Sequence, residues 1–329
     1  MYLLYTIGMN KLRVGVMRGG LGSEYHVSLR TGGNVLSALL GDKYEAHDIL
    51  ITNAGEWHID GRPTSPAKLA QHVDIVFNAL HGEFGEDGKV QKILELFNIP
   101  YTGSTAMPSA IGMNKDLAKK YFSAVGIKVP KGLVVSRGEE VSEVVTRVGA
   151  EIKAPYVVKP LSGGSSVGLS LAHTDRELVY AIERALAYSE KAMIEEYVRG
   201  REVTLGVVDS STGGSSYATP PLEILLPEYK LFDYDQKYKN LTHPVGPARM
   251  SDAELHALEE AALRAHAHLG ARHYARYDFI MTEGGPCLLE VNTLPGLTDT
   301  SLLMKSLALN GLTLPEFIDY VLTLALQKK

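Results

Sequence analysis

Short apolar runs alternate with helical patterns in the first third of the chain. Residues 12–17 and 75–78 are apolar segments of the length expected for buried strands. Helices are expected over residues 28–40 and 88–96. Strands that alternate with helices favour a mostly parallel sheet covered by helices. The pattern therefore predicts an α/β domain over residues 1–106.

The pattern changes over residues 107–195. Short strands and helices follow one another without the long apolar runs of the first domain, and a glycine-serine loop occupies residues 161–168. The elements expected there are helices over 114–124 and 139–149 and strands over 132–136 and 156–159. This segment is predicted to be a small α+β unit.

The last segment, residues 196–329, begins with an apolar strand over residues 202–208. A polar, tyrosine-rich stretch over residues 231–246 shows neither helical nor strand periodicity. A loop of that length inside a compact domain usually serves as a lid or a binding loop. We therefore expect residues 231–246 to cover a site.

A long amphipathic helix is expected after this loop. Ser251 followed by Glu254 has the spacing of a capping box, and Gly270 suits the C-terminal cap. Three histidines on this helix are interpreted as surface residues: His256, His266 and His268.

Composition excludes several classes of protein. The chain has 329 residues and a net charge of −5, and it lacks a long basic run, which argues against nucleic acid as a partner. No stretch reaches the ~18 apolar residues of a membrane span. The single cysteine, Cys287, cannot form an internal disulfide and is expected in the core. Residues 1–9 lack the basic lead of a signal peptide. These features predict a cytoplasmic protein.

Polar side chains alternate with apolar ones in a hairpin over residues 276–292. Glu290 and Asn292 share a face because side chains two apart on a strand point the same way, and hairpin pairing can place Asp278 beside them. Strict alternation also places Leu288 on that face. Carboxylate and amide oxygens are ligands that Mg²⁺ prefers. The alternative is the solvated polar face of an amphipathic hairpin.

Lys159 ends an apolar strand and precedes the glycine-serine loop that contains Ser165 and Ser166. Glycines allow backbone N–H groups to approach a phosphate, and serine hydroxyls add donors. The loop lacks the Gly-Lys-Ser/Thr ending of a Walker sequence. The glycines over residues 19–22 lack the Gly-x-Gly-x-x-Gly spacing, which disfavours an NAD-linked oxidoreductase.

Other candidate residues lie where strands end. Several of these residues follow strands of the first domain, where ligands of open α/β sheets bind: Glu24, His81, Glu86 and Asp87. Glu195 ends a strand, and the edge after it, with Tyr197 and Val198, offers backbone groups between apolar walls for adenine. Taken one by one, these residues are equally typical of ordinary loops and strand ends.

In combination, the motifs are specific. They are GGLGSEYHVSL (19–29), HGEFGEDGKVQ (81–91), YTGS (101–104), NKDLAKK (114–120), VVKPLSGGSSVG (157–168), IEEYVRGREVT (194–204), FDYDQKY (232–238), ARYDF (275–279) and LLEVNTLPGLTDTSL (288–302). Together they resemble the D-alanine–D-alanine ligases, members of the ATP-grasp superfamily, from about residue 12 to the C-terminus.

The resemblance implies a three-domain ATP-grasp architecture with ATP between the central and C-terminal domains. The residues that it implies for the ATP phosphates are Lys115, Lys159, Ser165, Ser166 and Lys237. Those that it implies for adenine and ribose are Glu195, Tyr197, Val198 and Glu202. It also implies two Mg²⁺ ions, which Mn²⁺ can replace, on Asp278, Glu290 and Asn292.

The resemblance implies the substrate contacts as well. Glu24, with Val27 and His81, is expected to receive the ammonium of the first D-alanine, and Ser301 and Leu302 the carboxylate of the second. Arg276 and the backbone N–H of Gly296 are expected to form the oxyanion site. A hydrogen-bonded triad of Glu24, Ser165 and Tyr238 is expected to link the first domain to the two loops.

The implied reaction transfers the γ-phosphoryl group of ATP to one D-alanine, and the amine of a second D-alanine then attacks the acyl phosphate. This serves peptidoglycan precursor synthesis, and the family implies a homodimer through the first domain. The nearest alternative joins D-alanine to D-lactate, against which Tyr238 argues, and another D-amino acid is also possible as the second substrate. A non-catalytic ATP-binding regulator is a further alternative.

Overall fold

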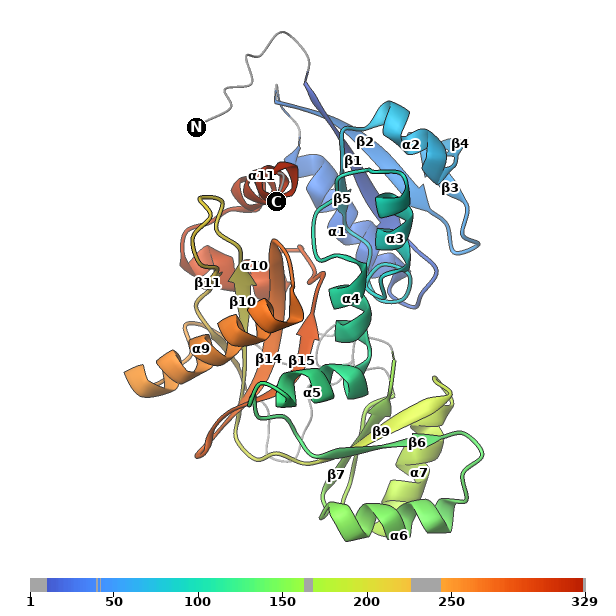
Figure 1. Cartoon of the computed structure of the whole chain (residues 1–329), viewed down its shortest axis with the longest axis vertical. Coiled ribbons are helices and arrows are strands. Elements are labelled where there is room, and N and C mark those ends of the chain that lie inside the picture. Colours follow the sequence, from blue (N-terminus) through green and yellow to red (C-terminus); the bar gives the residue numbers. More distant parts are fainter. Residues whose placement is uncertain (1–10, 40, 42, 163–167, 226–243, 328–329) are drawn as a thin grey trace.

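The computed structural model describes residues 11–39, 41, 43–162, 168–225 and 244–327, and its elements form three sheets with their covering helices (Figure 1). None of the helices in these ranges is long and apolar enough to cross a membrane. Ser165, Ser166, Lys237 and Tyr238, together with most of the expected lid, lie outside the described residues.

The first sheet has the strand order β4-β3-β2-β1-β5. Its strands are β1 (Leu12–Gly19), β2 (Tyr44–Ile51), β3 (Trp57–Ile59), β4 (Arg62–Thr64) and β5 (Ile75–Asn78), and its helices are α1 (Tyr25–Ala38), α2 (Pro66–His72) and α3 (Lys89–Leu96). β1 pairs in parallel with β2 and β5, which confirms the predicted parallel core. The antiparallel strands β3 and β4 extend the sheet and were not predicted.

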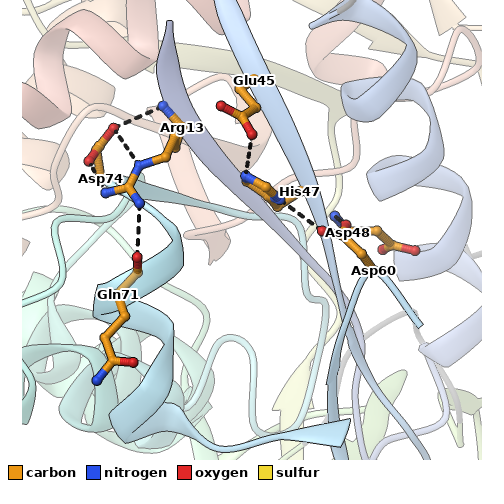
Figure 2. Close-up of polar contacts among 7 residues, drawn as sticks. All are labelled: Arg13, Glu45, His47, Asp48, Asp60, Gln71 and Asp74. Atoms are coloured by element: carbon orange, nitrogen blue, oxygen red, sulfur yellow. Dashed lines mark hydrogen bonds and ion pairs between the residues drawn. The ribbon is translucent and has the colours of Figure 1, made fainter. Parts of the chain in front are cut away.

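Polar side chains form ion pairs and hydrogen bonds between segments of this sheet (Figure 2). The Arg13 guanidinium lies 2.6 Å from the Asp74 carboxylate and donates to the Gln71 carbonyl at 2.9 Å, so that β1 is held to the segment before β5. On β2, His47 lies 2.8 Å from Asp60 and 3.4 Å from Glu45. These pairs are partly exposed, and none of them lies among the predicted site residues.

The second sheet is antiparallel and has the order β6-β9-β7-β8. Its strands are β6 (Gly132–Ser136), β7 (Tyr156–Pro160), β8 (Ser170–Ala172) and β9 (Lys191–Glu196), covered by α6 (Val141–Glu151) and α7 (Asp175–Leu186). Its apolar core is separate from the others. The elements predicted over residues 132–159 are confirmed to within about two residues at each end.

The third sheet has the path β13-β12-β10-β14-β15, with β11 also paired to β10. Its strands are β10 (Arg201–Val208), β11 (Tyr217–Ala218), β12 (Leu222–Ile224), β13 (Pro244–Val245), β14 (Tyr274–Thr282) and β15 (Gly285–Asn292). One face packs against α5 (Lys115–Ser123) and α9 (Asp252–Leu269). The capping box of Ser251 and Glu254 and the left-handed Gly270 confirm the predicted ends of α9.

A shared core joins the first and third units. Side chains of α10 (Leu302–Leu309) and α11 (Leu314–Leu326) pack with residues of α1, β1 and β5. The helix α4 (Ala106–Met113) also lies between the two units, next to both α3 and β15 (Figure 1). The loop after β15 is therefore placed directly beside the loops that follow β1 and β5.

Candidate active site

The hairpin of β14 and β15 brings the predicted metal ligands to one face. Asp278 pairs with Glu290 and Arg276 with Asn292, and directly opposed residues of antiparallel strands share a face. The buried Asp278 carboxylate accepts from Arg276 at 2.9 and 2.8 Å and from Thr204 Oγ1 at 2.6 Å. Two carboxylates, an amide oxygen and a guanidinium therefore converge as predicted.

A β-bulge decides which way these residues point. Phe279 pairs with Leu288 but Asp278 pairs with Glu290, so Leu289 is an extra residue in β15. Leu288 therefore packs in the core with Val291, and its predicted place on the polar face was wrong. Strict alternation fails because a bulge reverses the facing of every residue that follows it.

A second group of charges surrounds Glu195 at the end of β9. This carboxylate is 2% exposed and lies 2.5 Å from Lys119 and 2.9 Å from Lys159. Burial by itself would raise the pKa of Glu195, but the two lysines hold it below its ordinary value. Burial lowers the pKa of Lys119 to about 8, although Glu195 opposes the shift. The group carries two cations for one anion, which suits a neighbouring phosphate.

Lys119 was missed by the sequence analysis. It lies one helical turn after Lys115, which begins α5, and its neighbour Lys120 is exposed. Two adjacent lysines give no sign of which is buried, because α5 has only a short amphipathic pattern. The Lys115 backbone N–H lies 3.5 Å from the Leu161 carbonyl, which places the start of α5 beside the end of β7.

The ionic group and the hairpin are neighbours. Cys287 lies on β15 three residues before Glu290, and burial raises its pKa to about 11 while the charge of Lys119 opposes the shift. Cys287 is buried, as predicted.

The residues predicted for adenine and ribose follow β9. Tyr197 donates its backbone N–H to the Pro155 carbonyl at 3.0 Å, in the segment that leads from β9 to β10. Val198 lies in that same segment, and Glu202 lies on β10 on the face of Thr204 and Asp278.

The loop that follows β5 in the first domain carries two buried polar side chains, His81 and Glu86. His81 is buried, with Nδ1 2.9 Å from the Leu294 carbonyl and Nε2 2.8 Å from Thr31 Oγ1. Glu86 is buried and accepts from the backbone N–H of Gly82 at 2.7 Å and of Leu294 at 3.2 Å. Two residues of the first domain therefore contact the backbone of Leu294 in the C-terminal unit.

Glu24 lies against this loop at the start of α1, and Val27 lies in the first turn of that helix. A Cβ on Gly82 would meet the Glu24 carboxylate at 2.4 Å, and Gly82 has a left-handed backbone with φ of 65°. Burial raises the pKa of Glu86 to about 8, and the negative charge of Glu24 adds to the shift. Burial lowers the pKa of His81, so its ring is neutral.

Gly296 and Ser301 lie together after β15. A Cβ at Gly296 would meet Ser301 Oγ at 2.8 Å, so a side chain at this position would clash with Ser301. Ser301 Oγ accepts from the Thr298 backbone N–H at 3.0 Å, and Leu302 begins α10. The predicted oxyanion donor and the predicted second-substrate residues are thus adjacent in space.

Two family models match this chain. The model of the D-Ala–D-Ala ligase N-terminus matches residues 59–104, and the model of the C-terminus matches residues 121–323. A D-alanine–D-alanine ligase of Geobacter sulfurreducens is 39% identical over 94% of this chain and 93% of its own length. The chain belongs to the D-alanine–D-alanine ligase family.

Solved structures agree with this family membership. The VanG D-Ala:D-Ser ligase from Enterococcus faecalis superimposes with a TM-score of 0.84 at 30% identity, covering 96% of this chain and 100% of that one. The Bacillus anthracis D-alanine–D-alanine ligase complexed with ATP has a TM-score of 0.78 at 29% identity, covering 96% and 97%. The predicted ATP-grasp architecture is confirmed.

One predicted surface histidine of α9 is buried. His266 is 2% exposed, with Nε2 3.1 Å from Asp209 and Nδ1 3.1 Å from the Tyr277 hydroxyl. The prediction was wrong because α9 turns His266 toward β14, where Asp209 and Tyr277 satisfy both ring nitrogens. His256 is exposed, as expected. The Asp209–His266–Tyr277 network lies on the face of the third sheet opposite to Asp278.

Proposed function

We propose that the protein joins two molecules of D-alanine at the expense of ATP, through a D-alanyl phosphate, and so supplies the dipeptide for peptidoglycan precursors. The observation that carries this proposal is the polar face of the β14–β15 hairpin. This face carries the side chains of Asp278, Glu290, Asn292 and Arg276. Gly296 lies four residues after Asn292 in the sequence. Carboxylates for a metal and donors for an oxyanion are what phosphoryl and acyl transfer require.

Each group has a role in the proposed reaction. Lys115 and Lys159, with Ser165, Ser166 and Lys237 from the two loops, bind the ATP phosphates, while Glu195, Tyr197, Val198 and Glu202 hold adenine and ribose. Glu24 and Val27 receive the first D-alanine beside His81, and Ser301 and Leu302 receive the second. Arg276 and the Gly296 N–H stabilise the tetrahedral oxyanion. Glu24, Ser165 and Tyr238 form the linking triad.

The donor set fits Mg²⁺. Among the described residues, no three His, Cys, Asp and Glu side chains form a complete metal site. Asp278, Glu290 and Asn292 offer only oxygen atoms on one face, which suits a hard ion that keeps substrate phosphates as further ligands. Two Mg²⁺ ions, or Mn²⁺ in their place, would supply charge neutralisation on the transferred phosphoryl group.

The decisive experiment is a phosphate-release assay with ATP, Mg²⁺ and D-alanine. We expect phosphate release that depends on D-alanine, with D-alanyl-D-alanine as product. Nucleotide binding without phosphate release would instead support a non-catalytic ATP-binding regulator.

We expect Glu290→Gln to abolish turnover, with a loss of about 10³-fold or more in kcat, because a neutral amide cannot balance the metal charge. The melting temperature should stay within a few degrees of the wild type. Glu283→Gln is the matched control, since Glu283 is exposed in the turn of the same hairpin. Near-normal activity of Glu290→Gln would contradict the metal assignment.

A second D-amino acid or D-lactate is the alternative acceptor, and the likeness to a D-Ala:D-Ser ligase favours testing D-serine. The assay should compare D-alanine, D-serine and D-lactate as second substrates from pH 6 to 9. We expect D-alanine to be preferred at neutral pH. A clear preference for D-lactate or D-serine would replace the proposed substrate while leaving ATP use intact.

We also propose a cytoplasmic homodimer formed through the first domain. Leu96 of α3 and Met107 of α4 are 73% and 65% exposed, although both are large apolar side chains. Exposed apolar side chains on neighbouring helices suit a protein contact. Sedimentation of the wild type and of Leu96→Glu tests this, and a monomeric wild type would contradict it.

A further inference from the structure

The backbone N–H and carbonyl of Leu294 both contact side chains of the first domain. His81 contacts its carbonyl at 2.9 Å, and Glu86 accepts from its N–H at 3.2 Å. All three residues are buried, and His81 and Glu86 both belong to the loop after β5. Both backbone polar groups of Leu294, its N–H and its carbonyl, are therefore satisfied by the first domain.

The donors and acceptors allow one consistent assignment. A carbonyl oxygen only accepts, so His81 donates through Nδ1–H to Leu294. Because burial lowers the pKa of His81, its ring is neutral, and Nε2 accepts from the Thr31 hydroxyl. Both ring nitrogens are thus occupied by protein groups. This leaves His81 holding the loop, without a free nitrogen for a substrate.

Leu294 lies midway between two residues of the proposed chemistry. Asn292, a proposed metal ligand, is two residues before it, and Gly296, the proposed oxyanion donor, is two residues after it. The Leu294 side chain is buried, and a Cβ at Gly103 would meet it at 2.7 Å. Asn34 of α1 donates to the Leu297 carbonyl at 3.2 Å. The first domain therefore contacts the loop at three backbone atoms.

We propose that Glu86 and His81 are positioning residues, which clamp the backbone of Leu294 and thereby align Asn292 and Gly296 with the first-substrate residue Glu24. This inference rests on the proposed ligase function. The reacting groups come from two different domains, and a displacement of about 1 Å between them can cost about a hundredfold in rate. The clamp therefore links the two domains beside Asn292 and Gly296, the groups that must be aligned with Glu24.

Glu86→Gln tests the clamp with little change in volume. The Glu86 carboxyl receives two backbone N–H donors, whereas a glutamine amide accepts through one oxygen and presents an NH₂ group to the other donor. The shorter bond, to Gly82 in the same loop, should be kept, and the bond to Leu294 lost. We expect kcat to fall about tenfold or more, while the KM for ATP changes less than twofold.

Two controls separate clamping from general loosening of the loop. Gln91 donates to the Gly85 carbonyl at 2.7 Å inside the same loop and does not contact Leu294. Gln91→Met should therefore lower kcat much less than Glu86→Gln. In hydrogen–deuterium exchange, the Leu294 amide should exchange at least about tenfold faster in Glu86→Gln than in the wild type, and at nearly the wild-type rate in Gln91→Met.

Histidine variants provide an independent test. The amide nitrogen of asparagine can take the place of Nδ1, and that of glutamine the place of Nε2. His81→Asn should therefore keep the donor to Leu294 and retain about tenfold more activity than His81→Gln. The reverse order would overturn the clamp and indicate that Nε2 serves a substrate.

The outcomes distinguish this inference from the proposed function. An active wild type with unchanged kcat and unchanged Leu294 exchange in Glu86→Gln overturns the clamp alone. A wild type without D-alanine-dependent phosphate release overturns the proposed function, and the clamp with it. A selective loss of kcat with faster Leu294 exchange supports both.

Discussion

Glu86 and Glu195 are both buried glutamates near the candidate site, but their surroundings give them opposite charge states. Glu195 lies between Lys119 and Lys159, and these cations lower its pKa despite burial. Glu86 meets two backbone N–H groups and the negative field of Glu24, and burial raises its pKa to about 8. Burial alone therefore does not set ionisation, because the partners determine which form is stable.

The opposite charge states of Glu195 and Glu86 suit two different roles, the binding of an anion and the joining of two domains. The Glu195 group is an ionic cluster with one excess positive charge, next to the proposed phosphate-binding loop. The Glu86 site carries no formal charge at neutral pH and joins two domains through hydrogen bonds. The first can attract an anionic ligand, whereas the second can hold a loop without adding negative charge beside Glu24.

The largest expected effect follows from removing the anion of the first cluster. Glu195→Gln leaves two buried lysines without a counter-charge, and breaking a buried ion pair costs about 3–5 kcal/mol. We expect the free energy of unfolding to fall by about 3 kcal/mol in urea denaturation. Adding Lys119→Met to this variant should restore part of the loss. A loss below about 1 kcal/mol would show that the cluster is well solvated.

An intermediate effect is expected from the pH dependence of Glu86. Its pKa is about 8 in the folded protein and near 4.5 in the unfolded chain, so the folded state binds one more proton between these values. Raising the pH from 5 to 6.5 should therefore destabilise the wild type relative to Glu86→Gln, by on the order of 2 kcal/mol. Urea denaturation of both proteins at several pH values measures this. Parallel curves would mean that Glu86 is ionised throughout.

The smallest expected effect comes from Lys119→Met. With one cation removed, Glu195 should hold Lys159 more tightly and compete with the ATP phosphates for it. We expect the KM for ATP to rise about threefold to tenfold, or about 1 kcal/mol, with kcat little changed. Lys120→Met is the matched control, because Lys120 is exposed on the same helix and pairs with Asp116. Equal effects of the two variants would contradict the special role of Lys119.

Local patterns in the sequence predicted much of the architecture. The apolar runs of β1 and β5, the capping box of α9 and the alternating residues of the β14–β15 hairpin depend on neighbouring residues. Their motifs also predicted that Asp278, Glu290 and Asn292 share a face. These features were predictable because backbone geometry and side-chain alternation act over a few residues.

Tertiary structure alone decided the remaining features. The bulge at Leu289 returns Leu288 to the core, and α9 buries His266 against Asp209 and Tyr277. Local sequence contains no signal for either, since both depend on what packs against the element from elsewhere in the chain.

The same distinction applies to the two glutamates. The sequence by itself determined that Glu195 ends a strand and that Glu86 follows one, together with the family to which the chain belongs. Only the tertiary structure brought Lys119 of α5 to Glu195 and the Leu294 peptide to Glu86. The charge state of a buried group is set by partners from distant parts of the chain, and the fold determines which partners those are.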